Sequence, residues 1–422
     1  MTVNPQIPSE GPLSSLTESD WTNVSEYLSY GGTRNLHKAY RIPLTYLHYN
    51  IENGRYRTKY ELLKKANPGV HIDPREERWS TEITKMLNGT FEDPITGVNT
   101  RLERSHFEAL KEDIRNRGQE RPGIVLESGG VISGNRRLAA LRDLYQEAQE
   151  TRFGVFEAFM IPGRGSVSAT DRWRLEMSAQ VGQARLTRNY SPIERLLKIE
   201  EGIRLLMEHD PQTTEDSAIN VVANDFGADP DTIKGDYASL VHIREYLEAI
   251  GHPEEWWKVE GLTEVFTEVT PTLADATQSM RPADRGAFKR QIFHIIKNKQ
   301  ADYELLRTIR STIGSSRPSL GVPSAINILL ESAPGSESLA TEPTPASEAE
   351  AAQLVENYSA EVQARRDEQK PLKLADRAVT NLRTLNDVIS RGIPSGAPTS
   401  QLVQKITEAK DLSDDCLSRL NE

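Results

Sequence analysis

Ile132-Ser-Gly-Asn-Arg-Arg-Leu-Ala-Ala-Leu141 joins the end of an apolar strand to the start of an amphipathic helix. The strand ends at Ile132, and apolar residues recur at helical spacing from Leu138 onward. We predict that Asn135 is the N-cap, because its side-chain oxygen can accept a backbone N–H of the first turn. The segment therefore predicts a strand–turn–helix unit, around which the rest of the N-terminal half can be arranged.

Two arginines, Arg136 and Arg137, occupy the first turn of this predicted helix. A helix N-terminus carries about half a positive charge, so a cation there costs about 0.3–1 kcal/mol. A bound anion would remove that cost, and Gly134 would let a phosphate approach the exposed N–H groups closely. The alternative is that the guanidinium groups pair with carboxylates such as Glu127 or Asp143. Both interpretations remain open from the sequence.

The composition excludes several classes of protein. Cys416 is the only cysteine and the eight histidines are scattered, which argues against a disulfide framework and against a zinc site. The net charge of −11 argues against nonspecific coating of nucleic acid, although it allows a local basic patch. The sequence has neither a long apolar run nor a signal-peptide pattern at its start, so we expect no membrane span and a cytoplasmic location.

The hydrophobic pattern predicts an α+β protein: a small mixed-sheet domain followed by helices. The period of the pattern changes from two to about 3.6 after the first 165 residues. Strands are expected at 41–47, 123–126, 131–132 and 153–161, the middle two forming a hairpin. The expected regions are a flexible tail at 1–35, a mixed-sheet domain at 36–165 with an insertion at 57–100, a helical domain at 166–260, a helical extension at 261–314, a linker at 315–350 and a helical C-terminal unit at 351–422.

A helix-turn-helix is predicted at Ala218–Leu240, with Gly227 in the turn and Val222, Phe226 and Ile233 as its small core. Aspartates outnumber the single lysine at the start of its second helix, which is unfavourable next to DNA phosphates. The alternative is a helix pair retained for packing alone. The candidate DNA contacts are Thr232, Lys234, Lys198 and Arg244.

Four elements carry a resemblance to a known superfamily. Asn50 and Arg55 follow the first strand, and Gly134-Asn-Arg-Arg137 opens a helix. Glu176 lies on the next predicted helix, and Ser191-Pro-Ile-Glu194 begins another one before the helix-turn-helix. Over residues 38–250 the chain thus resembles the ParB/sulfiredoxin superfamily, and within it the ParB-like proteins.

The chain also departs from the pattern of this superfamily. Asn135 replaces the usual acidic residue, Ile51 and Gly54 replace prolines, and the Glu-Asn-x-x-Arg motif is not intact. The catalytic cysteine of sulfiredoxin is absent, so its sulfinic-acid chemistry is not available.

The resemblance implies that CTP or ATP binds with Mg²⁺. It implies that Glu176 holds the metal, and that Glu176 and Arg137 act in catalysis if the nucleotide is hydrolysed. The alternatives are that Glu176 is a surface carboxylate paired with Arg172 or Arg174, and that Arg55 is a surface residue beside a glycine turn. The implied nucleotide and phosphate contacts are Asn50, Arg55, Ser133, Gly134, Asn135, Arg136 and Arg137.

We therefore expect a ParB-like, DNA-associated protein with a nucleotide-binding N-terminal domain. It would act in plasmid or chromosome segregation, or in a mobile-element or phage-defence module. The alternatives are a nucleotide-dependent DNA nuclease or NTPase (a CTPase or ATPase) of the same superfamily, and an interaction protein that has lost its ligand. The expected partners are DNA and a second copy of the chain in a homodimer, with a protein partner at residues 351–422 as a further option.

Overall fold

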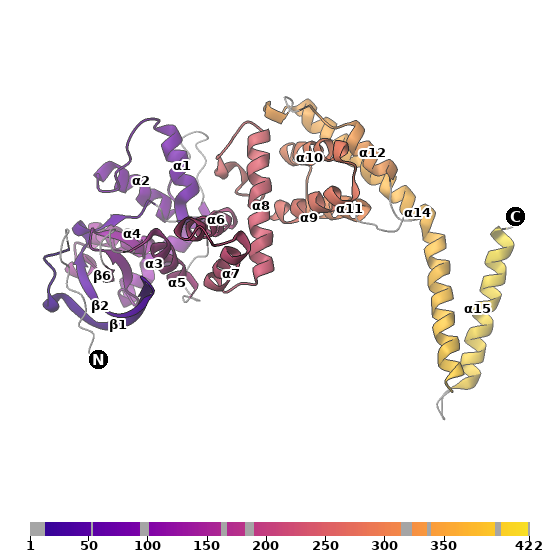
Figure 1. The fold of residues 1–422 in the computed structure, drawn as a ribbon, viewed down its shortest axis with the longest axis horizontal. Coiled ribbons are helices and arrows are strands. Elements are labelled where there is room, and N and C mark those ends of the chain that lie inside the picture. The colour runs from indigo at the N-terminus through magenta and orange to yellow at the C-terminus, as the bar shows by residue number, and fades with distance from the viewer. Residues whose placement is uncertain are drawn as a thin grey trace. The chain divides into compact units, whose positions relative to one another are not determined.

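The computed structural model describes residues 13–51, 54–92, 101–161, 167–181, 190–313, 323–335, 339–392 and 398–420. The chain divides into two compact units, Met1–Val355 and Glu356–Glu422 (Figure 1). The larger unit holds the sheet and the first helices, and it contains every residue that the sequence predicts to bind a ligand or DNA. The α+β class expected from the hydrophobic pattern is confirmed.

A six-stranded mixed sheet forms the N-terminal region, with the strand order β1-β2-β6-β4-β5-β3. β6 pairs in parallel with β4, and β5 pairs in parallel with β3, whereas the other neighbours are antiparallel. The predicted β4–β5 hairpin is confirmed. The strands are β1 (Trp21–Tyr30), β2 (Thr33–Pro43), β3 (His48–Tyr49), β4 (Gly123–Leu126), β5 (Gly130–Ser133) and β6 (Val155–Ile161).

Both faces of this sheet are buried. On β6, Phe156 and Met160 join the core formed with α2 (Glu77–Asn88), α3 (Arg101–Arg117) and α4 (Asn135–Ala148). Phe159 and Ile161 point to the opposite face, where Leu175 of α5 (Ala169–Val181) packs against them. Helices on both faces explain why all residues of β4 and β5 are buried, as is typical of strands inside a covered sheet.

The expected flexible tail is wrong over residues 13–35. Leu13 and Leu16 are buried in the main core, and residues 21–30 form strand β1, which pairs with β2. Only Leu28 and Tyr30 of this strand are buried, so its polar outer residues resemble those of a tail in sequence. The turn residues Gly31 and Gly32 both have positive φ, and a Gly-Gly pair between two strands is a hairpin signal. Residues 1–12 lie outside the described part of the chain.

The segment expected as an insertion belongs to the main core. It forms α1 (Arg57–Ala66) and α2, and Trp79 and Ile83 of α2 are buried against the sheet domain. Ion pairing between Lys65 and Glu255 also connects α1 to the residues that follow α8. Residues 93–100 of the expected insertion lie outside the described residues.

The predicted helix-turn-helix is present. α7 (Glu215–Phe226) and α8 (Pro230–Ala249) are joined through Gly227, whose φ of 62° is left-handed, and both contact α6 (Pro192–His209). Val222 and Ile233 are fully buried between these helices, while Phe226 is only partly buried. The core of this region also includes Trp173 of α5, which connects the three helices to the sheet domain.

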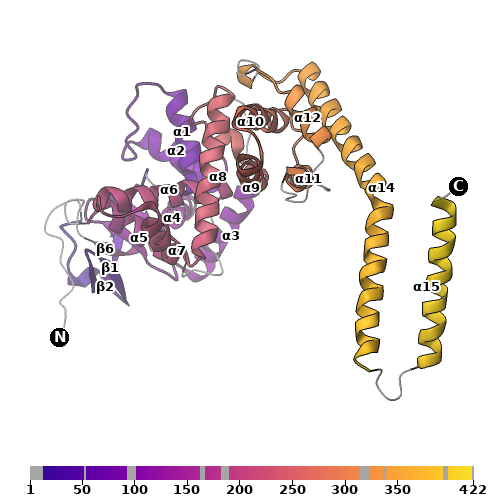
Figure 2. The same cartoon turned by 45° about the vertical axis from the view of Figure 1, so that its right-hand side comes forward.

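The described residues after α8 form further helices, the last of which ends at Leu420 (Figure 2). The segment 315–350 was expected to be a flexible linker, and this prediction is wrong for part of it. Residues 323–331 form α12, and α14 begins at Pro345. Leu329 of α12 is buried, and α12 contacts α10 and α11. Residues 314–322 and 336–338 lie outside the description. The later helices are α9 (Thr263–Ser279), α10 (Pro282–Lys297), α11 (Tyr303–Ile313), α12 (Pro323–Glu331), α14 (Pro345–Ser390) and α15 (Thr399–Leu420).

The smaller unit, taken by itself, is helical as expected. It consists of the C-terminal part of α14 followed by α15 (Figures 1 and 2). Within the described ranges, every helix is either too short or too polar to cross a bilayer.

Candidate functional site

The turn before α4 has a structural explanation that needs no anion. Gly134, not Asn135, is the N-cap, and its φ of 104° is a left-handed conformation that favours glycine. A Cβ at Gly134 would lie 2.8 Å from the ring of Phe156, so the sheet core also requires glycine here. The Asn135 side chain instead donates to the Val131 carbonyl oxygen at 2.9 Å and accepts from the Asn50 backbone N–H at 3.2 Å.

The two arginines of this turn differ in their surroundings. Arg137 donates from its guanidinium to the carbonyl oxygens of Arg121 and, at 3.3 Å, Pro122, which lie just before β4. These carbonyl dipoles compensate part of the Arg137 charge, and neither expected carboxylate is involved in those hydrogen bonds. Arg136 is buried, with 8% of its surface exposed, as is Ser133. The hydrogen bonds of Arg137 therefore connect the start of α4 to the residues just before β4.

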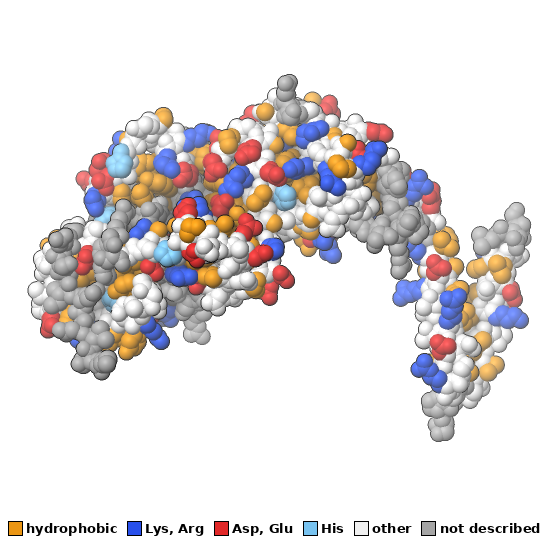
Figure 3. All heavy atoms as spheres, viewed as in Figure 1, with side chains coloured by type: hydrophobic (Ala, Val, Ile, Leu, Met, Phe, Trp, Pro, Cys, Tyr) orange, Lys and Arg blue, Asp and Glu red, His pale blue; other side chains and the backbone are white. Residues whose placement is uncertain are grey.

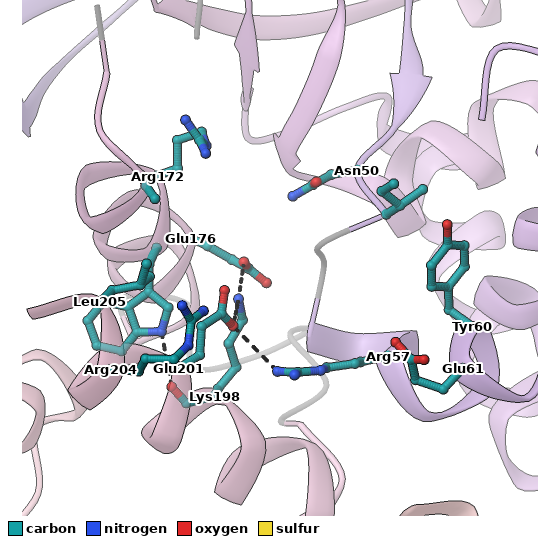
Figure 4. Close-up of a pocket in the computed structure, with 13 residues that line it drawn as sticks. Asn50, Arg57, Tyr60, Glu61, Arg172, Glu176, Lys198, Glu201, Arg204 and Leu205 are labelled. Atoms are coloured by element: carbon teal, nitrogen blue, oxygen red, sulfur yellow. Dashed lines mark hydrogen bonds and ion pairs between the residues drawn. The ribbon is translucent and has the colours of Figure 1, made fainter. Parts of the chain in front are cut away.

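A pocket of about 330 Å³ lies between the sheet domain and the helices α5 and α6 (Figure 4). Asn50 lies on its sheet side, Arg57 and Tyr60 come from α1, and Arg172 comes from α5. Figure 4 shows Arg172 and Asn50 on opposite sides of the opening. The full lining is Asn50, Ile51, Arg57, Tyr60, Glu61, Ala169, Arg172, Trp173, Glu176, Lys198, Glu201, Arg204 and Leu205.

A buried ion pair between Glu176 of α5 and Lys198 of α6 forms one wall of this pocket. The Glu176 Oε2 and Lys198 Nζ atoms are 2.8 Å apart, and the side chains are 3% and 2% exposed. Glu176 Oε1 accepts hydrogen bonds from the Tyr190 hydroxyl at 2.8 Å and the Gly54 backbone N–H at 3.2 Å. Both oxygens of this carboxylate are therefore engaged by groups of the protein itself.

Glu201 extends the ion pair into a small network. Its Oε2 atom lies 2.9 Å from Lys198 Nζ and 3.9 Å from Arg57 Nη1. Burial alone would lower the pKa of Lys198, but the charges of Glu176 and Glu201 outweigh that cost and raise it above its ordinary value. The two carboxylates thus favour the charged, ammonium form of Lys198.

Gly54 is needed where the chain passes over this network. A Cβ at this position would lie 2.8 Å from both Cε and Cγ of Lys198 and 2.9 Å from the ring of Tyr190. The backbone of Gly54 thus holds the lysine stem in place while its N–H group binds Glu176.

The predicted DNA contacts do not form one surface. Lys198 is wrong as a DNA contact, because a side chain that is 2% exposed cannot reach a duplex phosphate. Thr232 and Lys234 are exposed near the start of α8, and Lys234 pairs with Asp216 at 3.0 Å. Arg244 is farther along α8 and pairs with Glu200 at 2.5 Å. On the face drawn in Figure 3, basic and acidic side chains are interspersed.

The pocket brings together only part of the predicted site. Asn50 and Glu176 line it, and Asn135 adjoins it through its bond to Asn50. Ser133, Gly134, Arg136 and Arg137 are not among its lining residues. Glu176 does not match the surface alternative either, since its charged partner is Lys198 and not Arg172 or Arg174. The side chain of Arg55 is not among those that the structure describes.

Sequence reasoning missed Arg57 and Glu201. It considered Lys198 and Arg204 only as contacts to the DNA backbone, whereas both line the pocket. One signal was available: Lys198 stands between Leu197 and Ile199 on α6, in the apolar stripe of an amphipathic helix. A lysine in such a stripe is almost never fully buried unless it is paired, so the position calls for a carboxylate partner. The Glu201 partner follows at i+3.

Among the described residues there is no cluster of three or more His, Cys, Asp or Glu side chains that could hold a metal ion. Comparisons of this chain with protein-family models, with curated proteins and with solved structures return no match.

Proposed function

We propose that this chain is a ParB-like, DNA-associated protein that binds a nucleoside triphosphate, CTP or ATP, in the pocket between the sheet domain and α5–α6. The observation that carries the proposal is the pocket itself, where Asn50 of the sheet domain faces Arg172 of α5 with Arg57 and Arg204 nearby. The proposed role is in DNA segregation, or in a mobile-element or phage-defence module.

The size and charge of the pocket support a small phosphorylated ligand. A volume of about 330 Å³ falls at the lower end of the range of about 300–1,000 Å³ that is usual for ligand sites. Three arginines line it, and the planar guanidinium group can donate two parallel hydrogen bonds to one phosphate. Arg57 lies 3.9 Å from Glu201 and Arg204 lies 2.8 Å from Glu208, so a bound phosphate would share these guanidinium groups with carboxylates of the protein.

The Mg²⁺ ion implied by the resemblance does not fit at Glu176. Hard cations need open carboxylate oxygens, and those of Glu176 are bound by Lys198, Gly54 and Tyr190. A nuclease or NTPase mechanism that uses Glu176 as a metal ligand or catalytic base would first have to break this buried pair. We therefore propose binding of the nucleotide, and we derive no hydrolytic step.

The association with DNA is proposed for the exposed start of α8, in the helix-turn-helix. Thr232 and Lys234 are exposed there, and the start of a second helix is the part that approaches base edges in helix-turn-helix proteins. The pairing of Lys234 with Asp216 reduces the charge that this surface offers to phosphates. We therefore expect DNA affinity to be modest and to fall with added salt.

Self-association is proposed for the C-terminal unit. Large apolar side chains on both of its helices are exposed, including Leu372 at 65%, Leu412 at 61% and Leu417 at 55%. Apolar side chains repeated along a helix favour a partner helix, and a second copy of the chain would supply one. A different protein partner at the same helices is the alternative.

The test of the proposed function is a thermal-shift series with CTP, ATP and a mixed-sequence DNA duplex. A ligand that binds only the folded state stabilises it by about 2.7 kcal/mol when present at 100 times its Kd. We expect one of the nucleotides to raise the melting temperature, and Arg172→Ala to weaken its binding at least about tenfold, as expected for a lost hydrogen bond to a charged group.

Arg281→Ala is the matched control, because Arg281 is 84% exposed, is absent from the pocket lining and pairs with the neighbouring Asp284 at 2.8 Å. This variant should bind the nucleotide as the wild type does. The duplex should stabilise the wild type and Arg172→Ala equally. Stabilisation by the duplex but by no nucleotide would reject the nucleotide proposal and leave plain DNA binding.

A further inference from the structure

We infer that Lys198 replaces a divalent cation in this pocket, so that the ligand binds without a metal ion. The part of this inference that concerns the ligand rests on the proposed function. The replacement itself rests on the side chains of α5 and α6, and it can be tested without any nucleotide.

The ammonium group of Lys198 lies where a cation bridging two carboxylates would lie. Its Nζ atom is 2.8 Å from Glu176 Oε2 and 2.9 Å from Glu201 Oε2. These two oxygens come from different helices and meet at one positive charge. Glu176 is 3% exposed and Glu201 is 19% exposed, so little water is present to screen the interaction.

The packing around Lys198 prevents an incoming metal from displacing it. Its stem passes beneath the backbone of Gly54, so closely that a single added carbon would lie 2.8 Å from Cγ and Cε. The other oxygen of Glu176 is held by the Gly54 N–H and the Tyr190 hydroxyl. Expelling the lysine would therefore require movement of the backbone at Gly54 as well as loss of two ion pairs.

The charge of the lining agrees with a site that needs no metal. The basic lining residues are Arg57, Arg172, Lys198 and Arg204, and the acidic ones are Glu61, Glu176 and Glu201. The four cations exceed the three carboxylates by one, so the pocket is positive before any metal is added. The protein's own side chains therefore offset part of the charge of a phosphate chain, the role that Mg²⁺ has in many nucleotide sites.

The inference predicts that removing the lysine creates metal dependence. Lys198→Ala leaves Glu176 and Glu201 as two facing carboxylates without their shared cation, an arrangement that suits a hard divalent ion. We expect Mn²⁺ alone, titrated in the absence of nucleotide, to bind Lys198→Ala at least about tenfold more tightly than it binds the wild type. Mg²⁺ alone should raise the melting temperature of the variant and leave that of the wild type unchanged.

Two further variants make the result specific. Lys198→Ala with Glu201→Gln removes one of the two carboxylates and should lose most of the gained Mn²⁺ affinity. Lys85→Ala is the matched control, because it breaks a surface pair with Glu82, 2.8 Å apart, without leaving a facing pair of buried carboxylates. It should bind Mn²⁺ no better than the wild type does.

Lys198→Ala is expected to be unstable without metal, so its folding is itself a measurement. Recovery of the native circular dichroism spectrum on addition of Mg²⁺ or Mn²⁺ supports the inference. A variant that is indifferent to both metals, whether folded or unfolded, overturns it. So does Mn²⁺ binding by the wild type that Glu176→Gln abolishes.

Nucleotide binding with and without Mg²⁺ is a separate measurement. If the wild type binds CTP or ATP equally well in EDTA and in Mg²⁺, the metal-free part of the inference holds. Binding that requires Mg²⁺ overturns it. If no nucleotide binds at all, the proposed function fails, while the titrations with metal alone still decide whether Lys198 stands in for a cation.

Discussion

Glu176→Ala should lower the free energy of unfolding by about 3–5 kcal/mol, which is the usual cost of removing one partner of a buried ion pair. The substitution leaves Lys198, which is 2% exposed, with Glu201 as its remaining carboxylate among the described residues. It also leaves the Gly54 N–H and the Tyr190 hydroxyl without the oxygen that accepts from them. Chemical denaturation followed by circular dichroism measures the loss.

Two comparisons separate this effect from an ordinary loss of charge. Glu82→Ala breaks the surface pair with Lys85 and should cost less than about 1 kcal/mol. Glu176→Leu combined with Lys198→Met removes both charges and should restore much of the stability lost in Glu176→Ala, since apolar replacements of buried pairs are often tolerated. A loss below about 1 kcal/mol in Glu176→Ala would show that the pair is not buried as described.

Trp173→Ala should be comparably destabilising, by about 3–5 kcal/mol, as is typical of a large aromatic residue removed from a core. Trp173 is 2% exposed, and its indole N–H donates to the Lys198 carbonyl oxygen at 3.1 Å. A Cβ on Gly202 of α6 would lie 2.4 Å from the indole ring, so α5 and α6 are in close contact here. The ring therefore both fills the core and fixes the helix that carries Lys198.

The same variant should also lose nucleotide binding, because Trp173 lines the pocket and holds α6 against α5. Trp173→Phe keeps an aromatic ring and should retain part of both properties. Denaturation and thermal-shift measurements on the two variants provide the comparison. If Trp173→Ala were as stable as the wild type, the packing of α5 on α6 would have to differ from that described.

Local sequence signals predicted the elements that are fixed by their own residues. The β4–β5 hairpin contains Ser128-Gly-Gly130 between two apolar runs, and Gly129 has a φ of 85° in the structure. α6 begins with Ser191, Pro192 and Glu194, and both halves of its capping box are formed. α7 and α8 meet at Gly227, as their spacing indicated.

Contacts between distant residues were not predictable in the same way. Arg137 suggested an anion because its partners, the carbonyl oxygens of residues 121 and 122, precede β4 and reach it only once the sheet has formed. Lys198 resembled a surface cation because Glu176 lies on a different helix. Strand β1 was missed because only two of its side chains are buried. In each case the deciding contact belongs to the tertiary structure.

The position of bound phosphate distinguishes the pocket beside α5 and α6 from the start of α4. Crystals of the wild-type chain, soaked with CTP or ATP in EDTA, should show the phosphates beside Arg57 and Arg172, with the Lys198–Glu176 pair intact. Phosphate density at the start of α4, bound to Arg136 and Arg137 instead, would contradict the account. So would a pocket that stays empty at nucleotide concentrations that stabilise the protein in solution.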